Sequence, residues 1–250
     1  MCLLDSGLLP GRIPADSILG GINVSGEGDA GDLGATNNSH GSDVASTVLA
    51  QCPEAKLVIV KVLDDNGWLH SPEVIEAALT WILQSRSLIG KTVACAAFGD
   101  MFHYRSDAEF HGTPVQRMID TLHAEGSPTV AAAGNMYPRF RSAQPQGMAW
   151  PAILRNVVSV GVLDEGPDGP FPHGLSQRLH ASYGSGSRTT LFAPEAPPGD
   201  TSGAAALVAG RLAALRRHDP DQTVAGLVDI LLTGARTVRD RGTGLSWPGL

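Results

Sequence analysis

The chain has 250 residues, of which 42% are hydrophobic and 17% are charged, and its formal net charge is −7 at pH 7. This length and hydrophobic content allow a sizeable buried core and exclude a disordered chain. The negative charge and the lack of a lysine or arginine cluster argue against a surface for nucleic acid or for an anionic membrane. No uninterrupted apolar run is long enough to span a membrane.

The three cysteines, Cys2, Cys52 and Cys95, are too few for a disulfide framework and wrongly spaced for a zinc site. Two of them lie in apolar, strand-like runs, so we expect reduced, buried thiols. No signal peptide or prodomain is visible, because the first predicted strand begins at Met1 itself. We therefore expect a soluble, cytoplasmic protein with one domain over residues 1–250.

The first fifty residues predict two short strands, one long loop and one helix. Residues 1–4 are apolar and end at Asp5, which predicts a strand whose last residue is acidic. Residues 8–39 are rich in Gly, Asn, Ser and Asp, which is typical of a surface loop, with one short strand over 18–24. A helix is predicted to begin at His40 and to end near Gln51.

Strands and helices then alternate, and the strands are continuously apolar, as in parallel sheets. Strands are predicted over 57–63, 92–98, 128–133, 156–162 and 189–192, and helices over 72–84, 115–125 and 222–233. Between them we expect loops over 101–112, 136–150 and 164–188 and an irregular tail from Arg236. This alternation predicts an α/β fold with three layers, in which helices flank a mainly parallel, doubly wound central sheet.

A Pro/Gly loop at Pro198 and Gly199 precedes a run of small residues and helix formers, so a helix is predicted to begin at Thr201 or Ser202. The helix is apolar on nearly every side to Leu215, which favours a buried position. A serine at the positive end of a buried helix is well placed to act as a nucleophile if a base can reach it.

Three segments resemble, in order, the aspartate, histidine and serine motifs of the subtilisin-like serine proteases, peptidase family S8. They are Cys2–Gly7, His40–Ala45 and Asp200–Ala205. Family landmarks follow in family order over most of the chain: Lys61-Val62-Leu63 with Gly67, Ala132-Ala133-Gly134-Asn135, Trp150-Pro151-Ala152, Asn156–Gly161 and Phe192-Ala193-Pro194. Known subtilisins carry their triad in this chain order.

The resemblance implies a serine endopeptidase that works through an acyl-enzyme without a cofactor. It makes Ser202 the nucleophile, His40 the general base and Asp5 the acid that orients the base. Asn135 and the Ser202 amide would stabilise the negative oxygen of the tetrahedral intermediate. The expected partner is a peptide or protein substrate, and maturation of one specific peptide is one expectation.

The resemblance also implies where substrate binds. Ala97, Phe98 and Gly99 occupy the position at which the family binds an extended peptide as an added strand. Ala133 and Gly134, in the landmark that ends at Asn135, are also expected to bind substrate. Ala149 is placed near the floor of the main specificity pocket, where a small residue suggests an open pocket. Asp100 is either an ordinary loop residue or a carboxylate at the pocket rim that favours basic side chains.

Several residues depart from the family pattern. Asp43 stands in place of a second histidine, Gly203 in place of a common methionine and Ala206 in place of a common proline. Asp200 replaces a usual glycine; it could raise the pKa of His40, admit basic substrates or crowd the oxyanion site. Two further functions therefore stay open, namely a catalytically weak subunit that binds peptides and a ligase or cyclase that uses the same acyl-enzyme.

No metal site is expected, although the family often binds a structural calcium ion and uses a prodomain to fold. Asp29 and Asp32 lie in a loop whose composition favours solvation over calcium binding, and His103 and His111 lack the spacing of a metal site. Without a prodomain, we expect the chain to fold unaided, to form a homo-oligomer or to pair with a subunit that supplies the missing amino-terminal segment. A further alternative is that it is a portion of a longer product.

Overall fold

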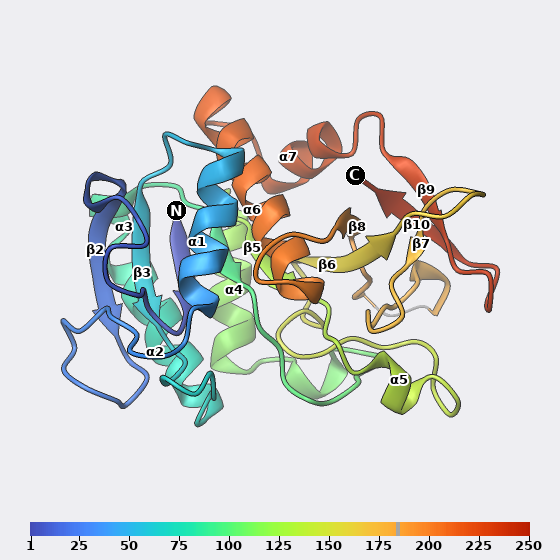
Figure 1. Ribbon diagram of the computed structural model, residues 1–250, viewed down its shortest axis with the longest axis horizontal. Helices are drawn as coiled ribbons and strands as arrows, with labels where there is room; N and C mark the ends of the chain where they lie inside the picture. Colours follow the sequence, from blue (N-terminus) through green and yellow to red (C-terminus); the bar gives the residue numbers. More distant parts are fainter. Residues whose placement is uncertain (184–185) are drawn as a thin grey trace.

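The computed structural model describes residues 1–183 and 186–250 and is built around one sheet (Figure 1). Among the described residues the strand order is β2-β3-β1-β4-β5-β6-β8-β10-β9, with β7 beside β6. The strands are β1 Cys2–Asp5, β2 Ile18–Asn23, β3 Leu57–Lys61, β4 Ala94–Ala96, β5 Thr129–Ala132, β6 Val157–Asp164, β7 Phe171–Pro172, β8 Leu191–Pro194, β9 Arg236–Arg239 and β10 Ser246–Gly249. All neighbouring pairs are parallel except β6 with β7 and β9 with β10.

Helices cover both faces of this sheet (Figure 1). They are α1 His40–Gln51, α2 Pro72–Gln84, α3 Arg86–Ile89, α4 Pro114–Ala124, α5 Tyr137–Phe140, α6 Asp200–His218 and α7 Val224–Leu231. Side chains alternate along each strand, so β1 sends Leu3 into the core under α1, α6 and α7, and Cys2 and Leu4 into the core under α2 and α4. Two buried faces explain why these strands are apolar at most positions on both faces, and the predicted three-layer α/β fold is confirmed.

Two further predictions can be compared with the structure directly. All three cysteines are free and buried, as expected. None of the described helices is both long and apolar enough to cross a bilayer. Of the predicted loop over 164–188, residues 184 and 185 lie outside the described part of the chain.

The prediction of an irregular tail from Arg236 is wrong. Strands β9 and β10 form an antiparallel hairpin that extends the sheet beyond β8. Its two buried large side chains, Val238 and Trp247, pack on Leu163 and Phe192 in a small separate core. With so few apolar residues, neither strand shows the run that marks the central strands. The predicted 136–150 loop likewise contains the short helix α5, and the predicted strand over 92–98 is reduced to the three residues of β4.

Parallel strands bring their carboxyl ends to one edge of the sheet, which is where ligands bind in open α/β folds. Asp5 is the last residue of β1, Ala97 follows β4, and Asn135 lies just beyond β5. Helix α1 begins at His40 at the same edge, and α6 begins two residues before Ser202. Fold topology therefore gathers residues from five distant segments.

Candidate active site

Asp5 and His40 form a direct hydrogen-bonded pair. The Nδ1 atom of His40 lies 2.8 Å from Asp5 Oδ1 and 3.0 Å from Oδ2, and the carboxylate is only 2% exposed. The backbone N–H of Ser6 also donates to Asp5 Oδ1, at 2.8 Å. An acidic acceptor at Nδ1 places the ring proton there, which leaves Nε2 of the neutral imidazole as a free base.

Close backbone packing between the first turn of α1 and the end of β1 brings His40 within reach of Asp5. A Cβ atom at Gly41 would lie 2.2 Å from the carbonyl oxygen of Gly7, so only glycine allows the helix to approach β1 this closely. The N–H of His40 donates to Asn38 Oδ1 at 2.9 Å, which fixes the start of the helix.

The pKa of His40 is raised above its ordinary value. Burial opposes the charged form, but the carboxylate of Asp5, through its charge and its hydrogen bond, and the charge of Asp43 together outweigh burial. The charges that raise this pKa are thus those of Asp5 and Asp43, and the expectation that Asp200 does so gains no support. Because its pKa is raised, His40 becomes neutral, and so able to act as a base, only at a higher pH than an ordinary histidine.

Ser202 lies in the first turn of α6, and its hydroxyl donates to the carbonyl oxygen of Ala97 at 2.6 Å. Within the described residues this hydroxyl is bonded to Ala97 and not to His40. The structure therefore brings Asp5 and His40 together and leaves the third proposed member hydrogen-bonded to the segment that follows β4. A rotation about the Cα–Cβ bond of Ser202 would be needed to free its hydroxyl for another acceptor.

Asn135 is oriented by Thr201, the residue before Ser202. Its Oδ1 accepts hydrogen bonds from the Thr201 hydroxyl at 2.7 Å and from the Thr201 N–H at 3.2 Å. Because the carbonyl end of the amide is held in this way, the NH₂ end remains to donate elsewhere. The Thr201 hydroxyl accepts in turn from the N–H of Gly134 at 3.3 Å. Sequence reasoning treated Thr201 only as a helix-start candidate and missed this role.

The residues expected to bind substrate lie together. Ala149 donates its N–H to the Ala133 carbonyl at 2.9 Å, and its Cβ lies 2.9 Å and 2.8 Å from where Cβ atoms on Gly99 and Gly134 would stand. Both glycines are thus needed to let the two flanking segments close on the Ala149 methyl group. Ala149 is fully buried between them, which leaves no exposed surface at its side chain.

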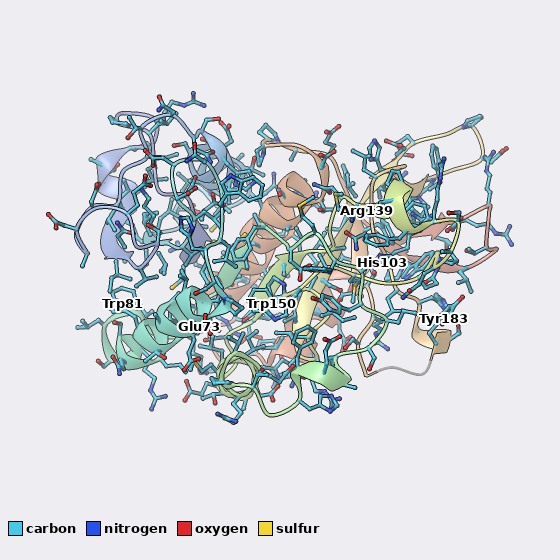
Figure 2. All side chains as sticks on the ribbon, turned by 90° about the horizontal axis from the view of Figure 1, so that it is seen from below. Glu73, Trp81, His103, Arg139, Trp150 and Tyr183 are labelled. Carbon is cyan, nitrogen blue, oxygen red and sulfur yellow. The ribbon has the colours of Figure 1, made fainter. Side chains whose placement is uncertain are left out.

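A large cavity of about 920 Å³ lies on the outer side of Gly99. Its walls are mostly apolar and include Trp68, Leu69, Phe98, Phe102 and Trp150. Three of the residues that line it, Glu73, Arg139 and Trp150, are labelled in Figure 2. The cavity runs beside the segment Ala97–Gly99, so it can receive side chains of a peptide bound there.

The carboxylate of Asp100 is engaged by three donors of the protein itself. Oδ1 accepts from the N–H groups of Trp150 and Phe102, at 3.1 Å and 3.2 Å, and Oδ2 accepts from the Tyr104 hydroxyl at 3.0 Å. Burial raises its pKa in spite of these bonds. This geometry favours the interpretation of Asp100 as a loop-bracing residue over that of a selector for basic side chains.

Two departures from the family pattern lie at the start of α6, and the packing there explains one of them, Gly203. A Cβ atom at Gly203 would lie 1.6 Å from the carbonyl oxygen of Ala196, so the loop before α6 fills the space that a side chain would need. Asp200 has a φ of +48°, a conformation that glycine adopts more readily. Its N–H donates to Glu195 Oε1 at 3.3 Å, within the same loop.

The loop over 27–34 is held by a protein cation. The buried ammonium group of Lys61 donates to the Gly34 carbonyl at 2.9 Å and to Asp65 Oδ1 at 3.1 Å, and it lies 3.7 Å from Glu27 Oε2. A calcium ion beside these oxygens would be repelled by Lys61, so these residues do not fit it. The described residues contain no group of three or more His, Cys, Asp or Glu side chains that could hold a metal ion.

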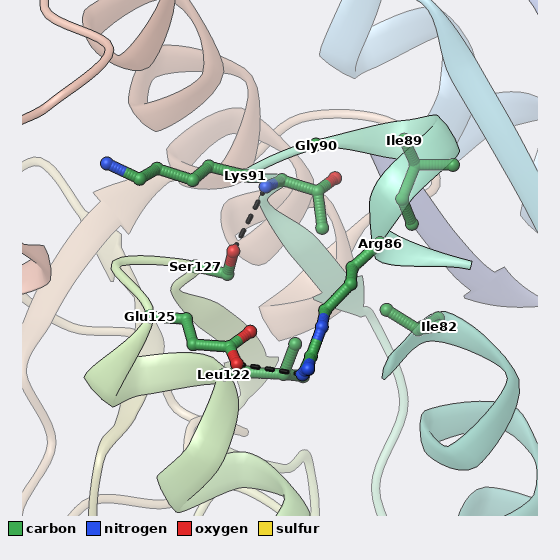
Figure 3. Close-up of a pocket in the computed structure, with 9 residues that line it drawn as sticks. Ile82, Arg86, Ile89, Gly90, Lys91, Leu122, Glu125 and Ser127 are labelled. Atoms are coloured by element: carbon green, nitrogen blue, oxygen red, sulfur yellow. Dashed lines mark hydrogen bonds and ion pairs between the residues drawn. The ribbon is translucent and has the colours of Figure 1, made fainter. Parts of the chain in front are cut away.

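A second cavity of about 380 Å³ lies at the opposite edge of the sheet, by the amino ends of β4 and β5 (Figure 3). Its charged groups are paired, since Arg86 bonds Glu125 at 2.8 Å and Lys91 bonds Asp221 at 3.1 Å. The Ser127 hydroxyl accepts from the Thr92 N–H at 3.1 Å. The position of this cavity separates it from the residues around Asp5 and His40.

Comparison with known structures supports the fold. Sphericase matches with a TM-score of 0.73 at 21% identity over 92% of this chain and 81% of that chain. The S41 psychrophilic protease gives 0.75 at 20% identity over 94% and 82%, and a cold-adapted subtilisin-like serine proteinase gives 0.74 at 22% identity over 100% and 86%. No curated protein sequence was found to match.

The sequence also matches a family model directly. The model of the subtilase family, Peptidase_S8, matches residues 2–246, which is nearly the whole chain. A match of this extent covers every segment described above, from β1 to the start of β10. The chain therefore belongs to the subtilase family of serine endopeptidases.

Proposed function

We propose that this subtilase hydrolyses peptide bonds through Asp5, His40 and Ser202, with Asn135 as an oxyanion donor. The observation that carries the proposal is the Asp5–His40 pair, because it leaves Nε2 of a neutral imidazole as a base at the edge where α6 begins. Support also comes from Thr201, which holds Asn135 so that its NH₂ group is free to donate.

In the proposed reaction the Ser202 hydroxyl leaves the Ala97 carbonyl and donates to His40 Nε2. Its oxygen attacks the substrate carbonyl while its proton passes to Nε2, and the Asp5 carboxylate stabilises the imidazolium. The negative oxygen receives hydrogen bonds from the Asn135 side chain and the Ser202 N–H. His40 then gives its proton to the leaving amine, and water releases the acyl group by the same sequence of steps. The reaction needs no cofactor.

The proposed substrate is an extended peptide or protein segment that pairs with Ala97, Phe98 and Gly99. Main-chain hydrogen bonds would hold it as an added strand, and the neighbouring cavity would receive an apolar side chain. A preference of this kind suits maturation of one specific peptide. Because Asp100 is already bonded to three donors, selection of a basic side chain is the weaker alternative.

A fluorophosphonate probe, which reacts covalently with an activated serine, tests the proposal. We expect the wild-type protein to be labelled and Ser202→Ala to be unlabelled, since the variant lacks the nucleophile. Ser182→Ala, which changes an exposed serine elsewhere in the chain, serves as the matched control and should be labelled like the wild type. Labelling that persists in Ser202→Ala, or that never occurs in the wild type, contradicts the proposal.

A second candidate function is a subunit that binds peptides but catalyses weakly. It is favoured by the bond from the Ser202 hydroxyl to the Ala97 carbonyl, which keeps the nucleophile away from the base. The same probe separates the two candidates, because a binding subunit would retain an extended peptide without being labelled. Peptide binding can be followed by fluorescence anisotropy with Ser202→Ala as the control.

A further inference from the structure

Gln177 is a buried side chain that joins two segments of the candidate site, and nothing in the sequence singled it out. It is fully shielded from solvent. Its side-chain Oε1 accepts from the N–H of Met136 at 3.2 Å, and its backbone N–H donates to the Gly134 carbonyl at 2.8 Å. Asn135 therefore lies between two residues that are both hydrogen-bonded to Gln177.

The other end of the Gln177 amide reaches the segment that continues the substrate strand. Its Nε2 donates to the Phe102 carbonyl at 2.8 Å and lies 2.8 Å from Nδ1 of His103. An amide NH₂ has two hydrogens, so it can serve both acceptors at once. The Gln177 side chain thus connects Met136 to residues 102–103, while its backbone holds Gly134.

His103 fixes which way the Gln177 amide points. Its Nε2 lies 2.8 Å from the Gln144 carbonyl, which can only accept, so Nε2 carries the proton and Nδ1 accepts from Gln177. The ring stacks on Phe140 with its centroid 4.7 Å away, which holds it in place. Burial lowers the pKa of His103, and the charges of Arg178 and Arg105 lower it further, which keeps Nδ1 unprotonated. The amide oxygen is consequently left for Met136.

We propose that Gln177 is a positioning residue, which holds the Asn135 loop against the substrate segment so that the Asn135 NH₂ group points at the developing oxyanion. This role rests on the proposed function. Thr201 fixes the Asn135 side chain from α6, the Gln177 side chain holds the N–H of Met136, and the Gln177 backbone N–H holds the carbonyl of Gly134. Displacement of a catalytic group by about 1 Å can lower a rate a hundredfold.

Gln177→Leu tests the role, because leucine fills a similar volume without the side-chain hydrogen bonds and keeps the backbone bond to Gly134. In labelling by a fluorophosphonate we expect the maximal rate of covalent reaction to fall between about tenfold and a hundredfold, with little change in the concentration for half-saturation. An oxyanion donor acts only in the transition state, which explains the split. Gln116→Leu is the matched control, since Gln116 is also buried but bonds Asp120 and the Arg155 carbonyl, and its labelling should match the wild type.

A double mutant separates positioning from a general loss of stability. If Gln177 acts through Asn135, Gln177→Leu should slow labelling much less in an Asn135→Ala background than in the wild type. Equal losses in the two backgrounds would show that Gln177 supports the fold only and would overturn the proposal. Should Gln177→Leu fail to fold, Gln177→Glu enters the same cycle, since it keeps an acceptor for Met136 and removes the donor to Phe102; its loss should also shrink without the Asn135 amide.

Amide hydrogen exchange provides a readout that does not depend on activity. Loss of the acceptor in Gln177→Leu should speed exchange of the Met136 amide at least tenfold, while the amide of Val130 in β5 keeps its wild-type rate. Unchanged exchange at Met136 overturns the role of Gln177. A wild type that is not labelled overturns the proposed function, whereas a labelled wild type whose rate is unaffected by Gln177→Leu overturns only the positioning role.

Discussion

The two helix starts at the candidate site differ in how they reach the sheet edge. At the start of α1, Gly41 packs on the backbone of Gly7, and His40 reaches Asp5 directly. At the start of α6, the loop before the helix packs on Gly203, and the Ser202 hydroxyl bonds the Ala97 carbonyl. Both regions depart from the family pattern, the first at Asp43 and the second at Asp200 and Gly203.

Gly203 and the loop that precedes α6 fit each other closely. The Ala196 carbonyl occupies the place of a side chain at position 203, and the Pro197 carbonyl accepts from the Thr47 hydroxyl of α1 at 2.6 Å. The loop thereby joins the two helices. A methionine at position 203 would have to displace this loop, so Gly203 belongs with the loop that covers it.

The largest effect on activity is expected from Asp5→Asn, which changes the partner of His40 in the first region. The amide can present an NH₂ group to Nδ1 of His40, which favours the wrong tautomer and places the proton on Nε2. In serine proteases this change lowers kcat by about ten-thousandfold. We expect a loss of that order, measured by peptide hydrolysis, with the fold retained by circular dichroism. Asp221→Asn, at an exposed carboxylate that pairs with Lys91, is the control. Activity within tenfold of the wild type would contradict the role of Asp5.

The second region is tested by Gly203→Ala. The added Cβ meets the backbone oxygen of Ala196 at 1.6 Å, so the loop must move, and overpacking of this kind costs about 1–3 kcal/mol or more. We expect a loss of that size in the free energy of unfolding, measured by urea titration. Gly226→Ala is the matched helical control, because there the nearest atoms belong to the flexible end of the Gln222 side chain. A stabilised Gly203→Ala would show that the loop does not constrain this position.

The pH dependence sharpens the account of His40. Its base form must be free for catalysis, and its raised pKa predicts that activity rises with pH through a midpoint above the ordinary histidine value of about 6.5. Asp43→Asn should move the midpoint to lower pH, since the charge of Asp43 helps to raise this pKa. A midpoint that does not move would assign the shift to Asp5 alone.

The raised pKa of His40 also makes the stability of the fold depend on pH. Because the folded-state pKa of His40 lies above the unfolded value, the stabilisation that it contributes is fully present below the unfolded pKa. It is lost as the pH rises through the folded pKa. Activity and this contribution to stability should therefore change in opposite directions over one pH range, which unfolding titrations at several pH values can follow.

The smallest expected effect is that of Asp200→Gly. Relief of the left-handed conformation is worth up to about 1–2 kcal/mol, less for aspartate, and loss of a carboxylate from the first turn of α6 costs about 0.3–1 kcal/mol. The terms nearly cancel, so we expect the free energy of unfolding to change by less than about 1 kcal/mol. Asp200→Asn keeps the conformational preference and removes the charge, which separates the two terms. A loss well above this range in Asp200→Gly would show that the carboxylate has another partner.

Much of the fold could be predicted from local patterns. Apolar runs marked the central strands because residues on both faces of a parallel sheet are buried, and the predicted bounds of α1 and α2 match the observed ones. The hairpin of β9 and β10 escaped prediction because Val238 and Trp247 are its only buried large side chains, too few to form a pattern.

The amino-acid sequence by itself determined the family, the layered architecture and the identity of the residues expected at the site, because motif order and apolar periodicity are local properties. Only the tertiary structure decided that Thr201 holds Asn135 and Gln177 holds Met136, that Asp100 is bonded to three donors, and that Gly203 accommodates the Ala196 carbonyl. Such contacts join residues far apart in the chain, and hydrogen-bonding partners of this kind follow from three-dimensional packing, which no local pattern encodes.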